Sequence, residues 1–238
     1  MFNSLGPEVI KLVHVGDNAT DPGYKNHRAG VFKGRNLDDV RTKDMVCVDL
    51  FSGLGGWSQS FVDHGWKVLT VDSNPEFNPH ICKDIMDLDA SILPRNPTII
   101  LASPPCQKFS SNTIKLNWKK RAIKDWGVVN AIGMVAKTLH IIGTCQPDYW
   151  IIENPRGMLR NVMGKPKETT YFRSWGASNL KPTDLWGIIP PMEFPAPLPD
   201  WDVDGTRLIN DAAIAAKIPY DLSDAVRVAI MVDVYGNL

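Results

Sequence analysis

A short apolar run that ends in two prolines limits the fold of this chain more than any other feature. Residues 99–102, Ile-Ile-Leu-Ala, form an uninterrupted apolar run that is typical of a strand buried on both faces of a parallel sheet. Pro104 and Pro105 cannot donate to a sheet hydrogen bond, so the strand must end before them. Cys106 follows at once, and open α/β sheets place their ligands just past the carboxyl ends of such strands. The pattern favours Cys106 as a nucleophile, although an isolated cysteine is more often a small buried apolar residue.

The composition is that of an ordinary globular chain of 238 residues, with 44% hydrophobic and 22% charged residues, which is long enough to bury a core. Lys plus Arg equals Asp plus Glu at 26 each, so any site for a polyanion must be a local patch. The four cysteines lie far apart without a CxxC pair, which indicates reduced thiols and no metal site. We find neither a membrane-spanning stretch nor a signal-peptide core, and therefore expect a soluble cytoplasmic protein without a membrane partner.

Strands and helices alternate along most of the chain. Beside the run at 99–102, strands are predicted at 45–50, 67–71 and 149–152, with a short one before Asp84 and a pair at 169–175 and 181–186. Helices are predicted up to about His64, and over about 128–143, 210–217 and 222–234. This alternation predicts an α/β fold with a doubly wound, mostly parallel, Rossmann-like sheet and late antiparallel strands.

The turn after the first strand is rich in glycine and leads into a helix. Such a turn lets the backbone approach the polar part of a nucleoside-containing cofactor. Its glycines have the spacing G-x-G-G rather than the G-x-G-x-x-G of dinucleotide-binding turns, which disfavours NAD. Asp72 ends the second strand, where a carboxylate can accept both ribose hydroxyls, unless it only forms the turn Asp-Ser-Asn-Pro. Asp84 could accept an adenine amino group or, equally, cap a helix.

Cys106 and Glu153 both follow buried strands and are both stiffened by proline, so we expect them to face the same crevice. A thiolate beside a carboxylic acid suits covalent attack on an electron-poor ring, with protonation of a ring nitrogen. The other interpretation of Glu153 is a structural hydrogen-bond acceptor.

Three motifs occur in order: D-L-F-S-G-L-G-G-W-S at 49–58, S-P-P-C-Q-K-F-S at 103–110 and I-I-E-N-P-R-G at 151–157. They resemble the ordered motifs of DNA (cytosine-5) methyltransferases. The resemblance implies a class I S-adenosylmethionine-dependent methyltransferase fold, with S-adenosylhomocysteine as product, and a target cytosine flipped into the pocket.

By this resemblance, Cys106 attacks C6 of the cytosine, Glu153 contacts and protonates N3, and the methyl group passes to C5. Arg173 is the best match to the next basic motif of the family, with Lys181 beside it as a second match. The cofactor-binding residues implied are Asp49, Phe51, Ser52, Gly53, Gly55, Gly56, Asp72, Ser73, Asp84, Ile85 and Pro104, with Pro104 near the sulfonium.

The segment from Gln107 to Lys124 is basic, with tryptophans interleaved, in a chain that is neutral overall. We interpret it as a mobile catalytic loop that contacts DNA phosphates, the alternative being a solvated basic face. The DNA-binding residues expected there are Gln107, Lys108, Ser110, Lys115, Lys119, Lys120 and Arg121.

The chain departs from the family where a separate target-recognition domain is usual. We expect residues 1–44 to be an arm or small extension, 45–187 the S-adenosylmethionine-binding catalytic domain, 188–206 a proline-rich segment in place of the recognition domain, and 207–238 C-terminal helices that pack on the catalytic domain. This organisation is similar to that of compact phage-borne members. Sequence specificity could then be short or loose, or a protein partner or the amino-terminal arm could supply it.

Two other functions are compatible with the same residues. The Cys–Glu chemistry could act on RNA or a free nucleotide, or with a modified donor. The chain could also be a non-catalytic cofactor-binding homologue, although that role would need neither Cys106 nor Glu153.

Overall fold

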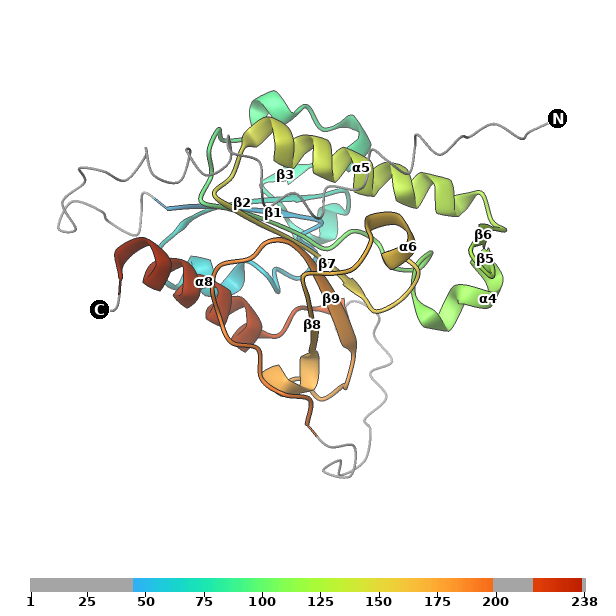
Figure 1. The fold of residues 1–238 in the computed structure, drawn as a ribbon. Helices are drawn as coiled ribbons and strands as arrows, with labels where there is room; N and C mark the ends of the chain where they lie inside the picture. The colour runs from blue at the N-terminus through green and yellow to red at the C-terminus, as the bar shows by residue number, and fades with distance from the viewer. Residues whose placement is uncertain (1–44, 199–215, 237–238) are drawn as a thin grey trace, which may run out of the picture.

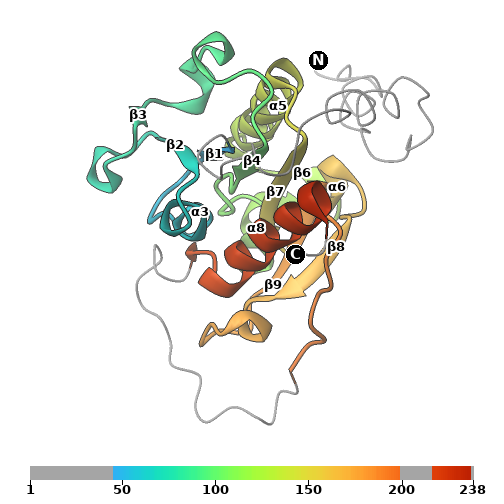
Figure 2. The same cartoon turned by 90° about the vertical axis from the view of Figure 1, so that its left-hand side faces the viewer.

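A seven-stranded sheet with helices on both faces forms the centre of the protein (Figures 1 and 2). The computed structural model describes residues 45–198 and 216–236. Three predicted segments lie wholly or partly outside these residues. They are the extension 1–44, the proline-rich segment from residue 199 onward, and the helix 210–217 up to residue 215.

The first half of the chain builds the parallel part of the sheet. Strands β1 (Val46–Leu50), β2 (Lys67–Asp72), β3 (Ile81–Cys82) and β4 (Ile99–Ala102) run parallel, and β4 also pairs in parallel with β7 (Tyr149–Pro155). All five strands therefore end at one edge of the sheet.

The second half adds the antiparallel part. Strand β9 (Pro182–Ile188) pairs antiparallel with β7 on one side and with β8 (Glu168–Tyr171) on the other, giving the order β3-β2-β1-β4-β7-β9-β8. The predicted doubly wound, mostly parallel sheet with late antiparallel strands is confirmed. The sequence predicted a strand over 169–175, but its second part is the 3₁₀ helix η7 (Phe172–Trp175).

Alternation along the buried strands divides the core into two layers. Val48, Ile100 and Ile152 face α5 (Gly127–Cys145), which lies across one side of the sheet together with η4 (Ile85–Asp87) and η5 (Ala90–Ile92). Leu101 and Ile151 face the opposite layer, where α3 (Gln59–Asp63) packs against α8 (Tyr220–Tyr235).

Helix α5 differs from the expectation that no stretch of this chain is apolar enough to span a membrane. A window of 18 residues within this 19-residue helix has a mean hydropathy of 1.4, so by length and composition the helix could cross a membrane. The same test is passed by core helices, and Val128, Val135 and Ile141 of α5 are buried against the sheet. Its apolar character is therefore explained by its packing on the sheet.

The remaining short elements lie between the strands. They are η3 (Pro75–Phe77), η6 (Ser111–Thr113), α4 (Ile114–Asn117), the hairpin of β5 (Trp118–Lys119) with β6 (Ala122–Ile123), and α6 (Arg160–Met163). The sequence predicted a mobile catalytic loop over Gln107 to Lys124 and gave no sign of α4 and the hairpin. A pair of two-residue strands is too short to give a detectable alternation, so this difference has a simple cause.

Candidate active site

The residues singled out from the sequence gather at the edge where the parallel strands end. This arrangement follows from topology, because β1, β2, β3, β4 and β7 all present their carboxyl ends there. The site has two parts, a pocket beyond β1 to β3 and a thiol–carboxylate centre beyond β4 and beside β7.

The pocket has a cavity volume of about 50 Å³ and opens to solvent. Aromatic and aliphatic side chains form much of its wall and two carboxyl groups stand among them. The lining residues are Phe51, Val71, Asp72, Ser73, Lys83, Asp84, Ile85, Pro105 and Met134. Flat walls of this kind with a few placed polar groups are suited to a nucleoside.

Asp72 joins the glycine turn to the end of β2. One carboxylate oxygen accepts the Gly53 N–H at 2.9 Å, and the other accepts the Asn74 N–H at 2.9 Å. Each oxygen has a further lone pair, so the fixed carboxylate can still accept ligand hydroxyls. The turn takes this shape because Phe51, Gly53 and Gly55 all have positive φ angles, of 60°, 48° and 70°. Phe51 is the strained residue of the three, since only glycine adopts this region freely.

Asp84 lines the pocket and at the same time caps η4, accepting the Met86 N–H at 2.9 Å. Both interpretations of this residue from the sequence are therefore compatible with its position. Pro105 lines the pocket, whereas the neighbouring Pro104, expected there, is buried and its carbonyl accepts the Asn154 amide at 2.9 Å.

Asp49 lies beneath the glycine turn and is 1% exposed. Burial raises its pKa to about 7, the hydroxyl and N–H of Ser58 partly offset this rise, and the charge of Asp72 adds to it. Neither carboxylate oxygen has a hydrogen-bond partner of normal geometry among the described residues. The Asp49 carboxyl group, which lies next to the glycine turn, therefore changes its charge near neutral pH.

Cys106 is half-buried on the turn after β4. The hydrogen bond from Asn154 to Pro104 ties this turn to the end of β7, the strand that carries Glu153. Burial raises the pKa of the Cys106 thiol, the positive charge of Lys181 partly offsets the rise, and the negative charge of Glu153 adds to it. The thiol therefore lies within electrostatic reach of both groups, as the sequence predicted for Cys106 and Glu153.

Glu153 lies inside β7 rather than after it, because β7 extends to Pro155, three residues beyond its predicted end. The carboxyl group is 2% exposed. Its Oε1 accepts a short hydrogen bond from the Thr183 hydroxyl and lies 3.5 Å from Lys181 Nζ. Lys181 Nζ also lies 4.2 Å from the centre of the Phe172 ring, so the cation is held on two sides.

Sequence reasoning named Lys181 only as a second match and missed Thr183. The alternation of side chains along β9 could have found both residues. Glu153 pairs with Leu185, and Thr183 and Lys181 precede Leu185 by two and four residues, so all of them lie on the same face of the sheet. Arg173, the preferred match, lies on η7, and its guanidinium donates to the Ser178 carbonyl at 3.2 Å. The cation that the structure brings to Glu153 is Lys181.

The basic segment after Cys106 is folded onto the Cys106 turn. Lys108 forms an ion pair with Asp125 at 2.6 Å, and the Trp118 indole donates to the Lys108 carbonyl at 2.7 Å. Gln107, Lys115, Lys119, Lys120 and Arg121 are exposed, and Ser110 is half-buried in a bridge to Gly157.

Comparisons with known proteins agree with these observations. The chain is 29% identical over 137 residues to a probable DNA (cytosine-5)-methyltransferase of Frog virus 3, covering 55% of this chain and 59% of that protein. It is 27% identical over 123 residues to the type II methyltransferase M.HgiGI of Herpetosiphon aurantiacus, covering 46% of this chain and 90% of the relative. The chain thus spans somewhat over half the length of the frog virus protein.

Among solved structures, a putative DNA modification methyltransferase encoded within an E. coli prophage is similar with a TM-score of 0.43 and 19% identity, covering 60% of this chain and 46% of that one. Residues 45–171, which carry the glycine turn, Cys106 and Glu153, match the family described as C-5 cytosine-specific DNA methylase. The chain belongs to the C-5 cytosine-specific DNA methylase family.

Proposed function

We propose that this protein transfers a methyl group from S-adenosylmethionine to C5 of a cytosine in DNA, with Cys106 as the nucleophile. The observation that carries the proposal is the thiol–carboxylate centre, in which Cys106 lies within electrostatic reach of Glu153 and Lys181. The family match supports the reaction class.

The pocket beyond β1 to β3 fits the adenosine part of the donor. Phe51 and Ile85 offer flat apolar walls, and Asp72 offers a carboxylate already fixed by two backbone N–H groups. Asp84 stands in the same wall and can accept an amino group. The other residues assigned to the donor are Asp49, Ser52, Gly53, Gly55, Gly56 and Ser73, with Pro105 rather than Pro104 on the pocket wall. When bound, the donor supplies an electrophilic methyl group.

The chemistry of the substrate explains why a thiol and a carboxyl group are needed together. C5 of cytosine is a poor nucleophile until the Cys106 sulfur adds to C6 and turns the C5–C6 double bond into an enamine. Glu153 hydrogen-bonds N3 and protonates it as the electrons of the ring move. After C5 has taken the methyl group, its proton passes to solvent water and N3 returns its proton to Glu153, so the C5–C6 double bond re-forms and the Cys106 thiolate leaves.

Lys181 and Thr183 hold the Glu153 carboxyl group in place for this step. The Thr183 hydroxyl donates to Oε1, which leaves the second oxygen to face the substrate. The charge of Lys181 favours the thiolate of Cys106, and its Nζ lies 3.5 Å from Glu153 Oε1. The target base must leave the DNA stack to reach this buried centre.

A trapping experiment tests the proposal. DNA that contains 5-fluorocytosine cannot lose its C5 substituent as a proton, so the native chain with S-adenosylmethionine should form a stable covalent adduct. Cys106→Ser should form none. Mass spectrometry of nucleosides from treated DNA would identify the group added.

The same experiment separates the alternatives. An adduct with RNA or a mononucleotide but not with DNA would contradict the proposed substrate. Failure of every substrate to form an adduct, with S-adenosylmethionine still bound in calorimetry, would favour a non-catalytic role.

A further inference from the structure

Trp57 joins the two parts of the site through its indole ring. The residue follows the glycine turn and is 2% exposed. Its Nε1 donates a hydrogen bond to the Ser103 hydroxyl oxygen at 3.0 Å. Ser103 directly follows β4, and only two prolines separate it from Cys106. The bond therefore links the turn of the donor pocket to the turn that carries the thiol.

Ser103 is held by both ends of the glycine turn. Its N–H donates at 3.3 Å to the carbonyl of Leu50, the last residue before the turn, and its hydroxyl accepts from Trp57, which follows the turn. The ring of each proline after Ser103 fixes its φ angle, so little backbone freedom remains between Ser103 and Cys106. A displacement of Ser103 would therefore displace the thiol as well.

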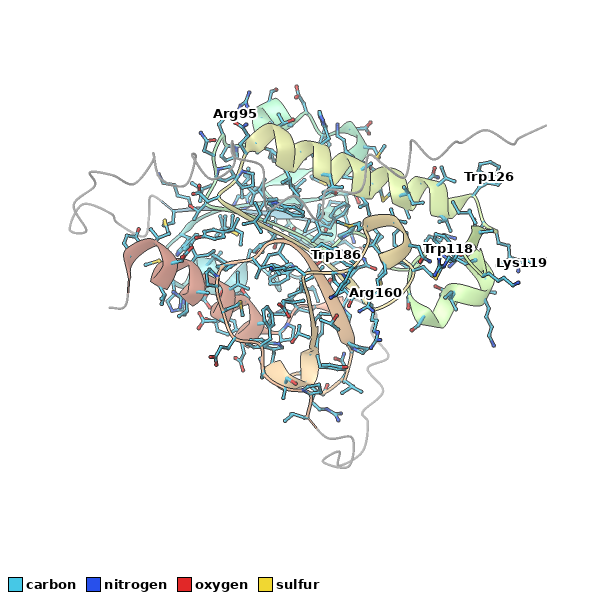
Figure 3. The ribbon with its side chains drawn as sticks, viewed as in Figure 1. Arg95, Trp118, Lys119, Trp126, Arg160 and Trp186 are labelled. Atoms are coloured by element: carbon cyan, nitrogen blue, oxygen red, sulfur yellow. The ribbon has the colours of Figure 1, made fainter. Side chains whose placement is uncertain are left out.

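The backbone of Trp57 is fixed in turn by α8. The Ser223 hydroxyl donates to the Trp57 carbonyl at 2.5 Å, and its oxygen lies 2.6 Å from the Ser60 hydroxyl oxygen. Ser223 has a single hydroxyl hydrogen, so Ser60 donates to Ser223. Both serines are buried, in a region between α8 and the sheet that side chains fill (Figure 3). Buried contacts therefore set the position of Trp57.

Trp66 shows that a tryptophan in this layer can be buried without such a bond. It belongs to the same apolar cluster as Trp57 and is 5% exposed, but its indole N–H has no hydrogen-bond partner among the described residues. The partner of Trp57, in contrast, lies on the turn that leads to the nucleophile. Packing of the layer alone does not account for this bond.

The thiol turn is thus held from two sides. Asn154 of β7 donates to the Pro104 carbonyl at 2.9 Å on the side of Glu153, and Trp57 holds Ser103 on the side of the glycine turn. We propose that Trp57 is a positioning residue for Cys106, which keeps the sulfur in place between the donor pocket and the carboxyl group. This inference rests on the proposed function, since that function gives the position of the sulfur its importance.

Four variants test this role. Trp57→Phe removes the indole N–H and keeps an aromatic ring, and Trp66→Phe is the matched control because no hydrogen bond is lost there. Ser103→Ala removes the other partner, and the double variant with Trp57→Phe tests whether both residues act through one bond. The readout is the rate at which iodoacetamide alkylates each of the four cysteines at several pH values, followed by mass spectrometry of their peptides without donor or DNA.

We expect Trp57→Phe to raise the alkylation rate of Cys106 at pH 7 by about 3-fold to 10-fold, which corresponds to about half a unit to one unit in the thiol pKa. Burial raises the pKa of this thiol, so a turn that loosens and exposes the sulfur moves the pH profile to lower pH. Lys181 and Glu153, whose charges reach the thiol, are unchanged in these variants.

The other variants and cysteines serve as internal references. Ser103→Ala should give the same change as Trp57→Phe, the double variant should give no more than either, and Trp66→Phe should leave the Cys106 rate as in the native chain. Cys47 and Cys145 are buried and should remain unreactive in every variant, whereas the exposed Cys82 should react at its native rate.

An unchanged Cys106 rate in Trp57→Phe would overturn the inference. So would a faster reaction of Cys47 and Cys145 together with Cys106, which would give the bond a role in the stability of the whole fold. Multiplied effects in the double variant would show that the two residues do not act through one bond, and would overturn it too.

The experiment needs neither methyl donor nor DNA, so its result is independent of the trapping experiment. Failure of trapping together with a selective change at Cys106 would remove the proposed reaction but not the positioning of the thiol by Trp57.

Discussion

Thr183 donates its hydroxyl hydrogen to Glu153 from the neighbouring antiparallel strand, at a diagonal position of the β7–β9 ladder. The two residues are 30 positions apart in the chain, and both are buried. The contact fixes one oxygen of the carboxyl group that we propose to act on the substrate.

Thr183→Val should lower the turnover number by about 10-fold to 100-fold, because it removes the hydroxyl donor at nearly constant volume and leaves Glu153 Oε1 held by Lys181 alone. Steady-state kinetics with DNA should show the loss in kcat rather than in the KM for the donor. Thr138→Val is the control, since that buried hydroxyl bonds only within α5. Equal loss in both variants would assign Thr183 a purely structural role.

The reactivity of Cys106 should depend on pH, and the charges of Lys181 and Glu153 should shift the pH at which the thiol becomes reactive. The pKa of the thiol is raised by burial, so its alkylation by iodoacetamide should increase as pH rises above neutrality. Lys181→Gln removes a charge that lowers this pKa and should move the profile to higher pH. Glu153→Gln removes a charge that raises it and should move the profile to lower pH. Mass spectrometry of the Cys106 peptide is the measurement, and coincident profiles would contradict the proposed electrostatic contact.

Asp49 should make the stability of the protein decrease as pH rises. The folded-state pKa of about 7 exceeds the ordinary value of 3.8, so between these values the folded state binds the extra proton. The free energy of unfolding should therefore fall with rising pH across this window, by up to about 4 kcal/mol for an ideal buried group. Asp49→Asn should flatten this dependence and stabilise the protein at pH 8, as measured by urea unfolding at several pH values. A pH dependence in the variant equal to that of the native chain would exclude Asp49 as its source.

Gly157→Ala should destabilise the fold by about 1–3 kcal/mol. A Cβ atom there would lie 2.2 Å from the Phe109 carbonyl oxygen, which also accepts the Met158 N–H, so the chain after Cys106 would have to move away from β7. Gly143→Ala is the matched control, because a Cβ atom there meets nothing within 4 Å and the residue lies inside α5. The control should stabilise the protein by about 1 kcal/mol, and denaturant unfolding of both variants checks the opposite signs.

Asp72→Ala should weaken binding of S-adenosylmethionine by about 1–3 kcal/mol, the scale of lost charged hydrogen bonds. The change also leaves the Gly53 and Asn74 N–H groups without their acceptor, which loosens the turn. Calorimetry with the isolated donor is the measurement. Unchanged affinity would remove Asp72 from the cofactor site.

The parallel half of the fold could be predicted because it depends on local signals, and the same signals single out Cys106 and Glu153 as candidates. Buried parallel strands are continuous apolar runs, and prolines and glycines mark their ends within a few residues. The strand β9 and its pairing with β8 were predicted as well. The pairing of β9 with β7 could not be predicted in this way, because a strand's second neighbour is set by packing across the whole sheet.

This dependence explains which site residues were missed. Thr183 looks like an ordinary strand residue until β9 lies beside Glu153. Lys181 is the stronger candidate for the same reason, because its Nζ lies 3.5 Å from Glu153 Oε1, whereas Arg173 donates to the Ser178 carbonyl. In the same way Pro104 and Pro105 are equivalent in the sequence, and only the direction of the turn decides that Pro105 lines the pocket.

Strand β8 is synthesised before β9 but joins the sheet only through it. A growing chain that has made Cys106, Glu153 and β8 still has an open edge at β7 and a carboxyl group without the Thr183 hydroxyl. The contact that we propose to orient Glu153 can therefore form only after β9 has been synthesised and has paired with β7. A chain that stops before β9 would contain Cys106 and Glu153 but not the Thr183 hydroxyl.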